Sequence, residues 1–192
     1  MLSYRRRLPH LHPDGQPLFL TWRLDGSLPP HRFFPTGNLN AGKAFVTMDR
    51  LLDHARTGPL YLARPEIARV LVEALVEGQD TLRHYDLHAF VVMANHVHVL
   101  ITPKVPVSKL LQRLKGSTAR RANQMLGLTG RAFWQEESYD RWVRDEREFH
   151  RIHAYIEANP VRAGLVAEPE DFPWSSAARG FQHGAGLKPG AA

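Results

Sequence analysis

The sequence has 192 residues and contains no cysteine. Disulfide bonds, zinc sites with cysteine ligands and thiol nucleophiles are therefore excluded, and this composition fits a reducing cytoplasm. No apolar run reaches the roughly 18 residues that a membrane-spanning helix needs. The basic N-terminal residues are not followed by the apolar segment of a secretory signal. We therefore expect a cytoplasmic protein with no membrane partner.

Positive charge is in excess. The formal net charge is +6 and the isoelectric point is about 10.0. Such a balance favours a polyanionic partner, most often a nucleic acid, although many basic proteins bind none. The length suits one domain with a sizeable core. We expect a basic arm over residues 1–16, one folded domain over 17–178 and a flexible tail over 179–192.

The patterns of apolar residues predict an ordered series of elements. These are a strand over 17–24, a loop over 25–43, a helix over 47–56, a helix from 65, strands over 87–93 and 97–102, a helix over 108–126, a strand over 138–144 and a helix over 145–158. The order predicts an α+β fold, a ferredoxin-like split βαβ sandwich with a mainly antiparallel sheet. We expect helices on one face of the sheet and an appended helix that carries Tyr155.

His96 and His98 begin the second strand of the predicted hairpin. Residues i and i+2 of a strand point to one face, about 6.5–7 Å apart, so two imidazoles can converge on one metal ion. Val97 would then point to the opposite, buried face. The alternative interpretation is a pair of surface histidines on a half-exposed strand, and the triplet alone does not decide between the two.

Tyr155 and Asn159 are four positions apart and therefore neighbours on one helix face. A tyrosine hydroxyl, with an ordinary pKa of about 10, is a poor nucleophile near neutral pH, but it can attack a phosphodiester that a metal ion polarises. Two histidines and an amide oxygen would leave positions open for that phosphate. Alternatively, Tyr155 is a tyrosine at the edge of the core with its hydroxyl in water. Asn159 could equally be the N-cap of a turn that Pro160 begins.

The helix predicted over 108–126 has a strongly basic exterior. We expect it to hold a nucleic-acid backbone, because phosphate contacts dominate affinity in such complexes. The predicted DNA-binding residues are Lys109, Arg113, Lys115, Arg120 and Arg121.

Four segments in order along the chain resemble the REP-associated tyrosine transposases, which are single-tyrosine HUH transposases with an IS200-like domain. The segments are 93–100 (MANHVHVL, with the HUH motif, where U is a hydrophobic residue), 115–119 (KGSTA), 133–141 (FWQEESYDR) and 155–166 (YIEANPVRAGLV). The resemblance covers about residues 15–178. One departure is Ala94, where the family pattern has proline before the Asn-His step.

The resemblance implies a ferredoxin-like nuclease that acts on single-stranded DNA next to a hairpin, here a REP-like palindrome. In such enzymes a tyrosine forms a 5′-phosphotyrosine intermediate and releases a 3′-hydroxyl that allows strand transfer. Carried over to this chain, Tyr155 is the nucleophile, and His96, His98 and Asn159 hold a divalent metal ion, Mg²⁺ or Mn²⁺.

Two other functions share parts of this pattern. A domesticated protein that binds hairpins without cutting them would have the same fold and basic surface. A structural zinc domain could use the two histidines, although four zinc ligands are hard to find without cysteine. Oligomeric state is open, because a monomer would assemble the site within one chain and a homodimer could pair the tyrosine helix of one subunit with the histidines of the other.

Overall fold

The computed structural model describes residues 15–28, 47, 49–53 and 58–181. Nearly all of the predicted N-terminal arm, most of the predicted loop over 25–43 and most of the predicted tail lie outside these residues. The division into arm, domain and tail therefore stays a prediction.

Among the described residues, four strands form one sheet. They are β1 (Leu18–Arg23), β2 (Tyr85–Val92), β3 (His96–Pro103) and β4 (Tyr139–Trp142). Their order in the sheet is β2-β3-β1-β4, and each neighbouring pair is antiparallel. Helix α2 (Pro65–Asp80) connects β1 to β2, and α3 (Val107–Leu126) connects β3 to β4. This is the split βαβ order that the sequence predicts, so the α+β, ferredoxin-like fold is confirmed.

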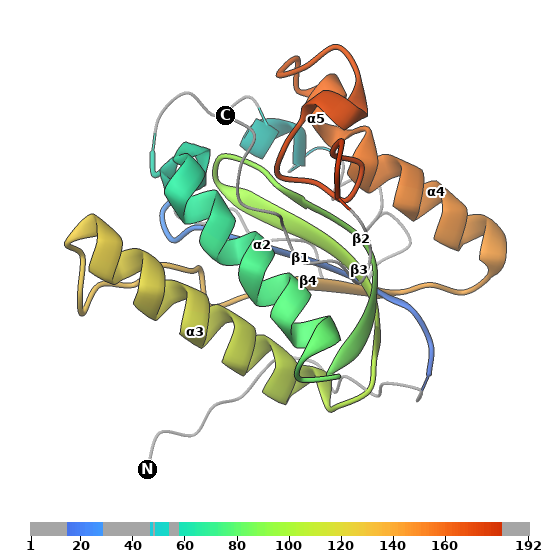
Figure 1. Cartoon of the computed structure of the whole chain (residues 1–192), viewed down its shortest axis with the longest axis horizontal. Helices are drawn as coiled ribbons and strands as arrows, with labels where there is room; N and C mark the ends of the chain where they lie inside the picture. The colour runs from blue at the N-terminus through green and yellow to red at the C-terminus, as the bar shows by residue number, and fades with distance from the viewer. Residues whose placement is uncertain (1–14, 29–46, 48, 54–57, 182–192) are drawn as a thin grey trace.

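Helices cover both faces of the sheet (Figure 1). Helices α2 and α3 contact each other and lie on one face, while α4 (Glu146–Glu157) contacts β2 and β3 from the other. The strands alternate accordingly. Leu20 and Val97 belong to the core beneath α2 and α3, whereas Phe19 and Leu100 belong to a second core beneath α4. The face of the sheet covered by α4 is also the face to which His98 belongs.

Shorter elements complete the chain. The described residues at 47 and 49–53 are helical, within the helix predicted over 47–56. A 3-10 turn η1 (Tyr61–Ala63) precedes α2, and α4 continues into α5 (Asn159–Arg162) and a second 3-10 turn η2 (Pro169–Asp171). In the part of the chain that the structure describes, no helix combines the length and the apolar character needed to cross a bilayer.

Two local features explain how α4 and α5 are placed. Asp145 caps α4, and its carboxylate accepts a 2.7 Å hydrogen bond from the backbone N–H of Glu148. At the other end, Gly164 has a left-handed φ of 71° and ends the turn that follows α5. The tyrosine-bearing helix therefore has a defined start and a defined exit.

Candidate metal and tyrosine site

His96 and His98 meet in the interior. Their Nε2 atoms are 3.1 Å apart, and both side chains have 0% exposure. The alternation of β3 places both rings on the α4 side of the sheet, as the i, i+2 spacing predicts. The alternative interpretation, two surface histidines, is wrong because both rings are fully buried, beneath α4 and the helical residues at 49–53.

Each ring is oriented by a second contact at its Nδ1 atom. His96 Nδ1 lies 2.7 Å from Asn95 Oδ1, and His98 Nδ1 lies 2.7 Å from Thr21 Oγ1. The Asn95 amide is itself oriented, since its Nδ2 donates to the carbonyl of Leu52 at 3.0 Å. An amide oxygen only accepts, so His96 carries its proton on Nδ1 and directs the lone pair of Nε2 toward His98.

Asp49 adds a carboxylate beside the two histidines. We call these three residues, with Tyr155 and Asn159, the cluster. Its side chain is fully buried, and its Oδ1 lies 2.9 Å from His98 Nε2 and 3.5 Å from His96 Nε2. Asp53, one helical turn later, has its Oδ1 3.6 Å from His96 Nε2. Sequence reasoning missed both residues. The available signal was two acids four positions apart on a predicted helix, which places them on one face.

Tyr155 reaches the same carboxylate from α4. Its hydroxyl donates a hydrogen bond to Asp49 Oδ2, and Asn159 Nδ2 lies 3.3 Å from the same oxygen. The tyrosine ring lies edge-on to His98, with centroids 5.9 Å apart. The Arg162 guanidinium lies 4.4 Å from the centroid of the Tyr155 ring. The candidate nucleophile and the histidine pair therefore meet within one chain.

The surroundings of Asn159 and Tyr155 decide between the interpretations that the sequence left open for each residue. Asn159 is helical, its side chain is fully buried, and the residue before it, Ala158, occupies the cap position of α5. The interpretation of Asn159 as an N-cap is therefore wrong, because its amide faces Asp49 instead. The Tyr155 hydroxyl likewise donates to the buried Asp49 carboxylate, so the interpretation that places it at the edge of the core with its hydroxyl in water is wrong.

Burial and charge set the protonation of the cluster. Burial, aided by His98, lowers the pKa of His96 to about 3, against the opposite influence of Asp49. Burial by itself would raise the pKa of Asp49, but His98, His96 and the Tyr155 hydroxyl hold it well below its usual range. Burial and the Asp49 charge raise the pKa of Tyr155 above its usual value, while Arg162 acts in the other direction. The cluster thus has a neutral imidazole at His96, a carboxylate and a protonated phenol.

These residues fit a divalent cation. The candidate ligand atoms of Asp49, His96 and His98 all lie within 4.8 Å of one another. Asn159 Oδ1 is buried and accepts no hydrogen bond from the described residues. An unsatisfied buried acceptor typically costs about 1–3 kcal/mol, which a bound cation would relieve. Imidazole nitrogens together with carboxylate and amide oxygens are a donor set for a divalent transition-metal ion such as Mn²⁺.

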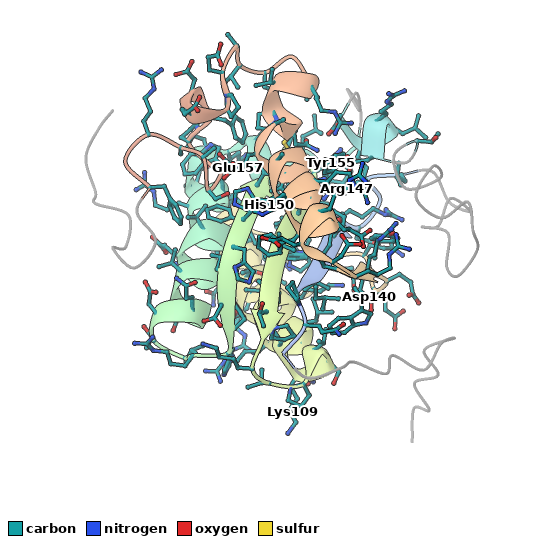
Figure 2. The ribbon with its side chains drawn as sticks, turned by 90° about the vertical axis from the view of Figure 1, so that its right-hand side faces the viewer. Lys109, Asp140, Arg147, His150, Tyr155 and Glu157 are labelled. Atoms are coloured by element: carbon teal, nitrogen blue, oxygen red, sulfur yellow. The ribbon has the colours of Figure 1, made fainter. Side chains whose placement is uncertain are left out.

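The five basic residues predicted to bind DNA lie on α3, across the sheet from Tyr155 (Figures 1 and 2). Lys109, Arg113 and Arg120 are exposed. Lys115 Nζ donates to the carbonyls of Gln135 and Glu136, at 2.7 and 2.9 Å. Arg121 Nη2 lies 2.6 Å from Glu73 Oε2. The structure does not bring these residues together with the cluster, and their role in binding DNA stays a prediction.

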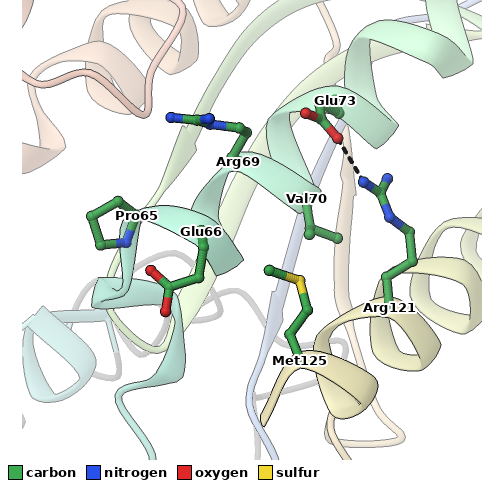
Figure 3. A pocket seen from close by; sticks show the side chains of 7 residues that line it. All are labelled: Pro65, Glu66, Arg69, Val70, Glu73, Arg121 and Met125. Carbon is green, nitrogen blue, oxygen red and sulfur yellow. Dashed lines mark hydrogen bonds and ion pairs between the residues drawn. The ribbon is translucent and has the colours of Figure 1, made fainter. Parts of the chain in front are cut away.

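A surface pocket of about 360 Å³ lies between α2 and α3 (Figure 3). Its lining includes the ion pair of Arg121 and Glu73 and the half-exposed Met125. Residues Pro65, Glu66, Arg69 and Val70 complete it. The pocket is on the face of the sheet opposite to the cluster, so it does not contribute to the candidate site.

Comparisons with known proteins agree with this arrangement. Residues 65–159 match the family model described as "Transposase IS200 like". The chain is similar to a solved REP-associated tyrosine transposase bound to a REP hairpin, with 19% identity, a TM-score of 0.54, and coverage of 92% of this chain and 82% of the other. At that identity the likeness supports the fold alone.

A second solved structure is described as a transposase from Deinococcus radiodurans R1. It is 19% identical, with a TM-score of 0.42, and the match covers 83% of this chain and 98% of the other. A comparison with curated proteins finds no match. The family model, the fold and the buried histidine pair agree, and we conclude that the chain carries an IS200-like transposase domain of the HUH type, with His96-Val97-His98 as its HUH motif.

Proposed function

We propose that this protein is a metal-dependent endonuclease and strand transferase that cleaves single-stranded DNA next to a hairpin, with Tyr155 as its nucleophile. The observation that carries the proposal is the double contact of one buried carboxylate. Asp49 Oδ2 accepts the hydrogen bond of the Tyr155 hydroxyl, while Asp49 Oδ1 lies 2.9 Å from His98 Nε2. This arrangement supports a phosphate held between a tyrosine and a metal site.

A divalent cation such as Mg²⁺ or Mn²⁺ would polarise the non-bridging oxygens of the scissile phosphate. His96, His98 and Asn159 are the proposed ligands, and Asp49 Oδ1 joins them by its position in the cluster. The contacts at Nδ1 from Asn95 and Thr21 hold the two imidazoles in orientation.

The chain's own residues carry the covalent step. The Tyr155 oxygen forms a bond to phosphorus as the bond from phosphorus to the 3′-oxygen breaks. The phenol proton already points at Asp49 Oδ2, which can receive it, and the departing 3′-oxygen takes up a proton to become a free 3′-hydroxyl. Attack of a 3′-hydroxyl on the phosphotyrosine reverses the step and joins strands. Arg162, over the tyrosine ring, opposes the rise in the pKa of the phenol and so favours its deprotonation.

The test is a covalent adduct. The full chain, incubated with hairpin-bearing single-stranded DNA and Mn²⁺, should give a protein–DNA species that survives denaturing electrophoresis. Tyr155→Phe should give none, whereas Tyr61→Phe, a tyrosine stacked on Phe133 away from the cluster, should behave as the parent chain.

The histidine variant separates cutting from binding. His96→Ala should abolish the adduct and retain most hairpin binding, because phosphate contacts dominate affinity. An adduct that persists in Tyr155→Phe would refute the assignment of the nucleophile. A parent chain that binds hairpins and never forms an adduct would instead indicate the non-cleaving hairpin-binding protein.

A further inference from the structure

Three arginines surround one buried carboxylate on the α4 side of the sheet. Glu148 has only 3% of its side chain exposed. Arg141 Nη2 lies 2.6 Å from its Oε1, Arg151 Nη2 lies 3.1 Å from the same oxygen, and Arg144 Nε lies 3.0 Å from its Oε2. The backbone N–H of Arg144 also donates to Oε2, at 3.0 Å. We call Arg141, Arg144 and Arg151 the arginine cluster.

The arginine cluster faces solvent, although its anchor is buried. The side chains of Arg144 and Arg151 are 71% and 66% exposed, and that of Arg141 is 31% exposed. A guanidinium group has five N–H donors, and the contacts with Glu148 use only one or two of them in each arginine. The arginine cluster therefore presents oriented N–H donors and an excess of positive charge, the combination that binds phosphate.

The strand register places the arginine cluster beside the candidate active site. His98 pairs with Thr21, and Thr21 pairs with Tyr139 on the next strand. Arg141 follows Tyr139 by two residues and so belongs to the same face of the sheet. Two strand spacings across and two residues along give about 12 Å between the backbone positions of His98 and Arg141.

The helix gives the same relationship independently. Glu148 precedes Tyr155 by seven residues on α4, which corresponds to two turns and about 10 Å along the axis. Figure 2 shows α4 in front of the sheet, with Tyr155 and Arg147 labelled along it. A few nucleotides of single strand span such a separation.

We propose that the arginine cluster is a phosphate-binding subsite for the single-stranded DNA that flanks the scissile phosphate. Glu148 preorganises the three guanidinium groups, so that little side-chain freedom is lost when a phosphate binds. This inference rests on the proposed function, which places the scissile phosphate at Tyr155. It adds a surface on the tyrosine side of the sheet to the α3 surface predicted from the sequence.

The test uses binding without cleavage. The full chain, free of divalent metal, is titrated with a mixed-sequence single-stranded oligonucleotide at several NaCl concentrations. Arg144→Gln combined with Arg151→Gln should weaken binding about 10-fold near physiological salt and reduce the slope of log K against log[NaCl] by about 1.4, or 0.7 for each phosphate contact. The matched control is Arg69→Gln combined with Arg83→Gln, which removes two exposed arginines of and after α2 and should change neither quantity as much.

A second measurement needs no variant. Phenylglyoxal modification of the parent chain, followed by mass spectrometry, should show that the oligonucleotide protects Arg144 and Arg151 but not Arg69. Equal salt slopes in the two double variants, or no protection of Arg144 and Arg151, would overturn the inference. Neither assay requires an adduct at Tyr155, so failure of the proposed chemistry and failure of the subsite are distinguishable.

Discussion

The Tyr155 hydroxyl donates a hydrogen bond to Asp49 Oδ2, although the two residues are 106 positions apart in the chain. The same carboxylate lies 2.9 Å from His98 through its other oxygen. One acidic side chain therefore links the tyrosine helix to the histidine strand. A change at Asp49 should therefore affect both the metal site and the tyrosine.

Asp49→Asn keeps the shape of the side chain and removes its charge. We expect Mn²⁺ to raise the thermal midpoint of the parent chain, because a ligand that binds only the folded state stabilises it, and to raise that of the variant much less. Adduct formation should slow by about tenfold or more, equivalent to at least about 1.4 kcal/mol. Asp86→Asn, at an exposed carboxylate paired with Lys104, is the control. An unchanged Mn²⁺ shift in Asp49→Asn would contradict a role in metal binding.

Thr21→Val removes the hydroxyl at His98 Nδ1 with little change of volume. Loss of such an orienting contact typically reduces metal affinity by about 10- to 100-fold, and calorimetric titration with Mn²⁺ would measure it. Thr102→Val is the matched control, because Thr102 Oγ1 lies 2.7 Å from His88 Nε2, outside the cluster. Equal affinities in the two variants would show that Thr21 does not orient a ligand.

Arg162→Ala should slow adduct formation without weakening metal binding. The guanidinium lies 4.4 Å from the Tyr155 ring centroid and opposes the rise in the pKa of the phenol. We expect a rate about 3- to 10-fold lower, in line with about 0.5–2 kcal/mol for a cation beside an aromatic ring. Single-turnover measurement with saturating DNA checks this, with Arg69→Ala as the control. If the rate falls and Mn²⁺ also no longer raises the thermal midpoint of the variant, Arg162 instead supports the fold of the site.

Gly78→Ala should destabilise the fold although the glycine is within a helix. An added Cβ would lie 2.2 Å from the Tyr85 hydroxyl oxygen, which donates to the Leu75 carbonyl at 2.8 Å. Overpacking of this kind typically lowers the free energy of unfolding by about 1–3 kcal/mol, and urea titration would measure the loss. Gly116→Ala in α3 has nothing within 4 Å of the new Cβ and should stabilise by up to about 1 kcal/mol. Equal effects of the two substitutions would refute the packing argument.

Glu148 should stabilise the folded state near neutral pH, and this contribution should be lost in acid. Burial favours a higher pKa for its carboxyl, but bonds from Arg144 and the charge of Arg141 prevail and lower the pKa to about 2. Since the folded pKa is below the unfolded value of about 4.3, this stabilisation is complete above pH 4.3 and is lost as the pH falls toward 2.

Urea unfolding at several pH values can measure this effect. Glu148→Gln should lower the unfolding free energy by about 1–2 kcal/mol near pH 7, a value discounted because the arginines are partly exposed, and the difference should shrink below pH 4. Glu73→Gln, at an exposed pair with Arg121, should show a smaller difference at every pH. A gap between parent and Glu148→Gln that stays constant down to pH 2 would contradict the assignment.

Local pattern determined much of this protein. Alternation of apolar residues predicted the hairpin with His96 and His98 on one face, and the i, i+4 spacing predicted that Tyr155 and Asn159 are neighbours. Both rest on the periods of strands and helices, which act over a few residues and so can be read from a single sequence. The order of the elements was sufficient to predict the split βαβ sheet.

Tertiary structure alone decided which residues complete the site. Asp49 comes from a short helix after β1. Its i, i+4 spacing to Asp53 puts two acids on one helix face but does not indicate that this face meets a strand some 50 positions later. Its place follows from the sheet order and from the face on which α4 packs. The basic exterior of α3 was evident from the sequence, but its position across the sheet from Tyr155 was not. Such contacts depend on how whole layers pack, which the period of a single helix or strand does not specify.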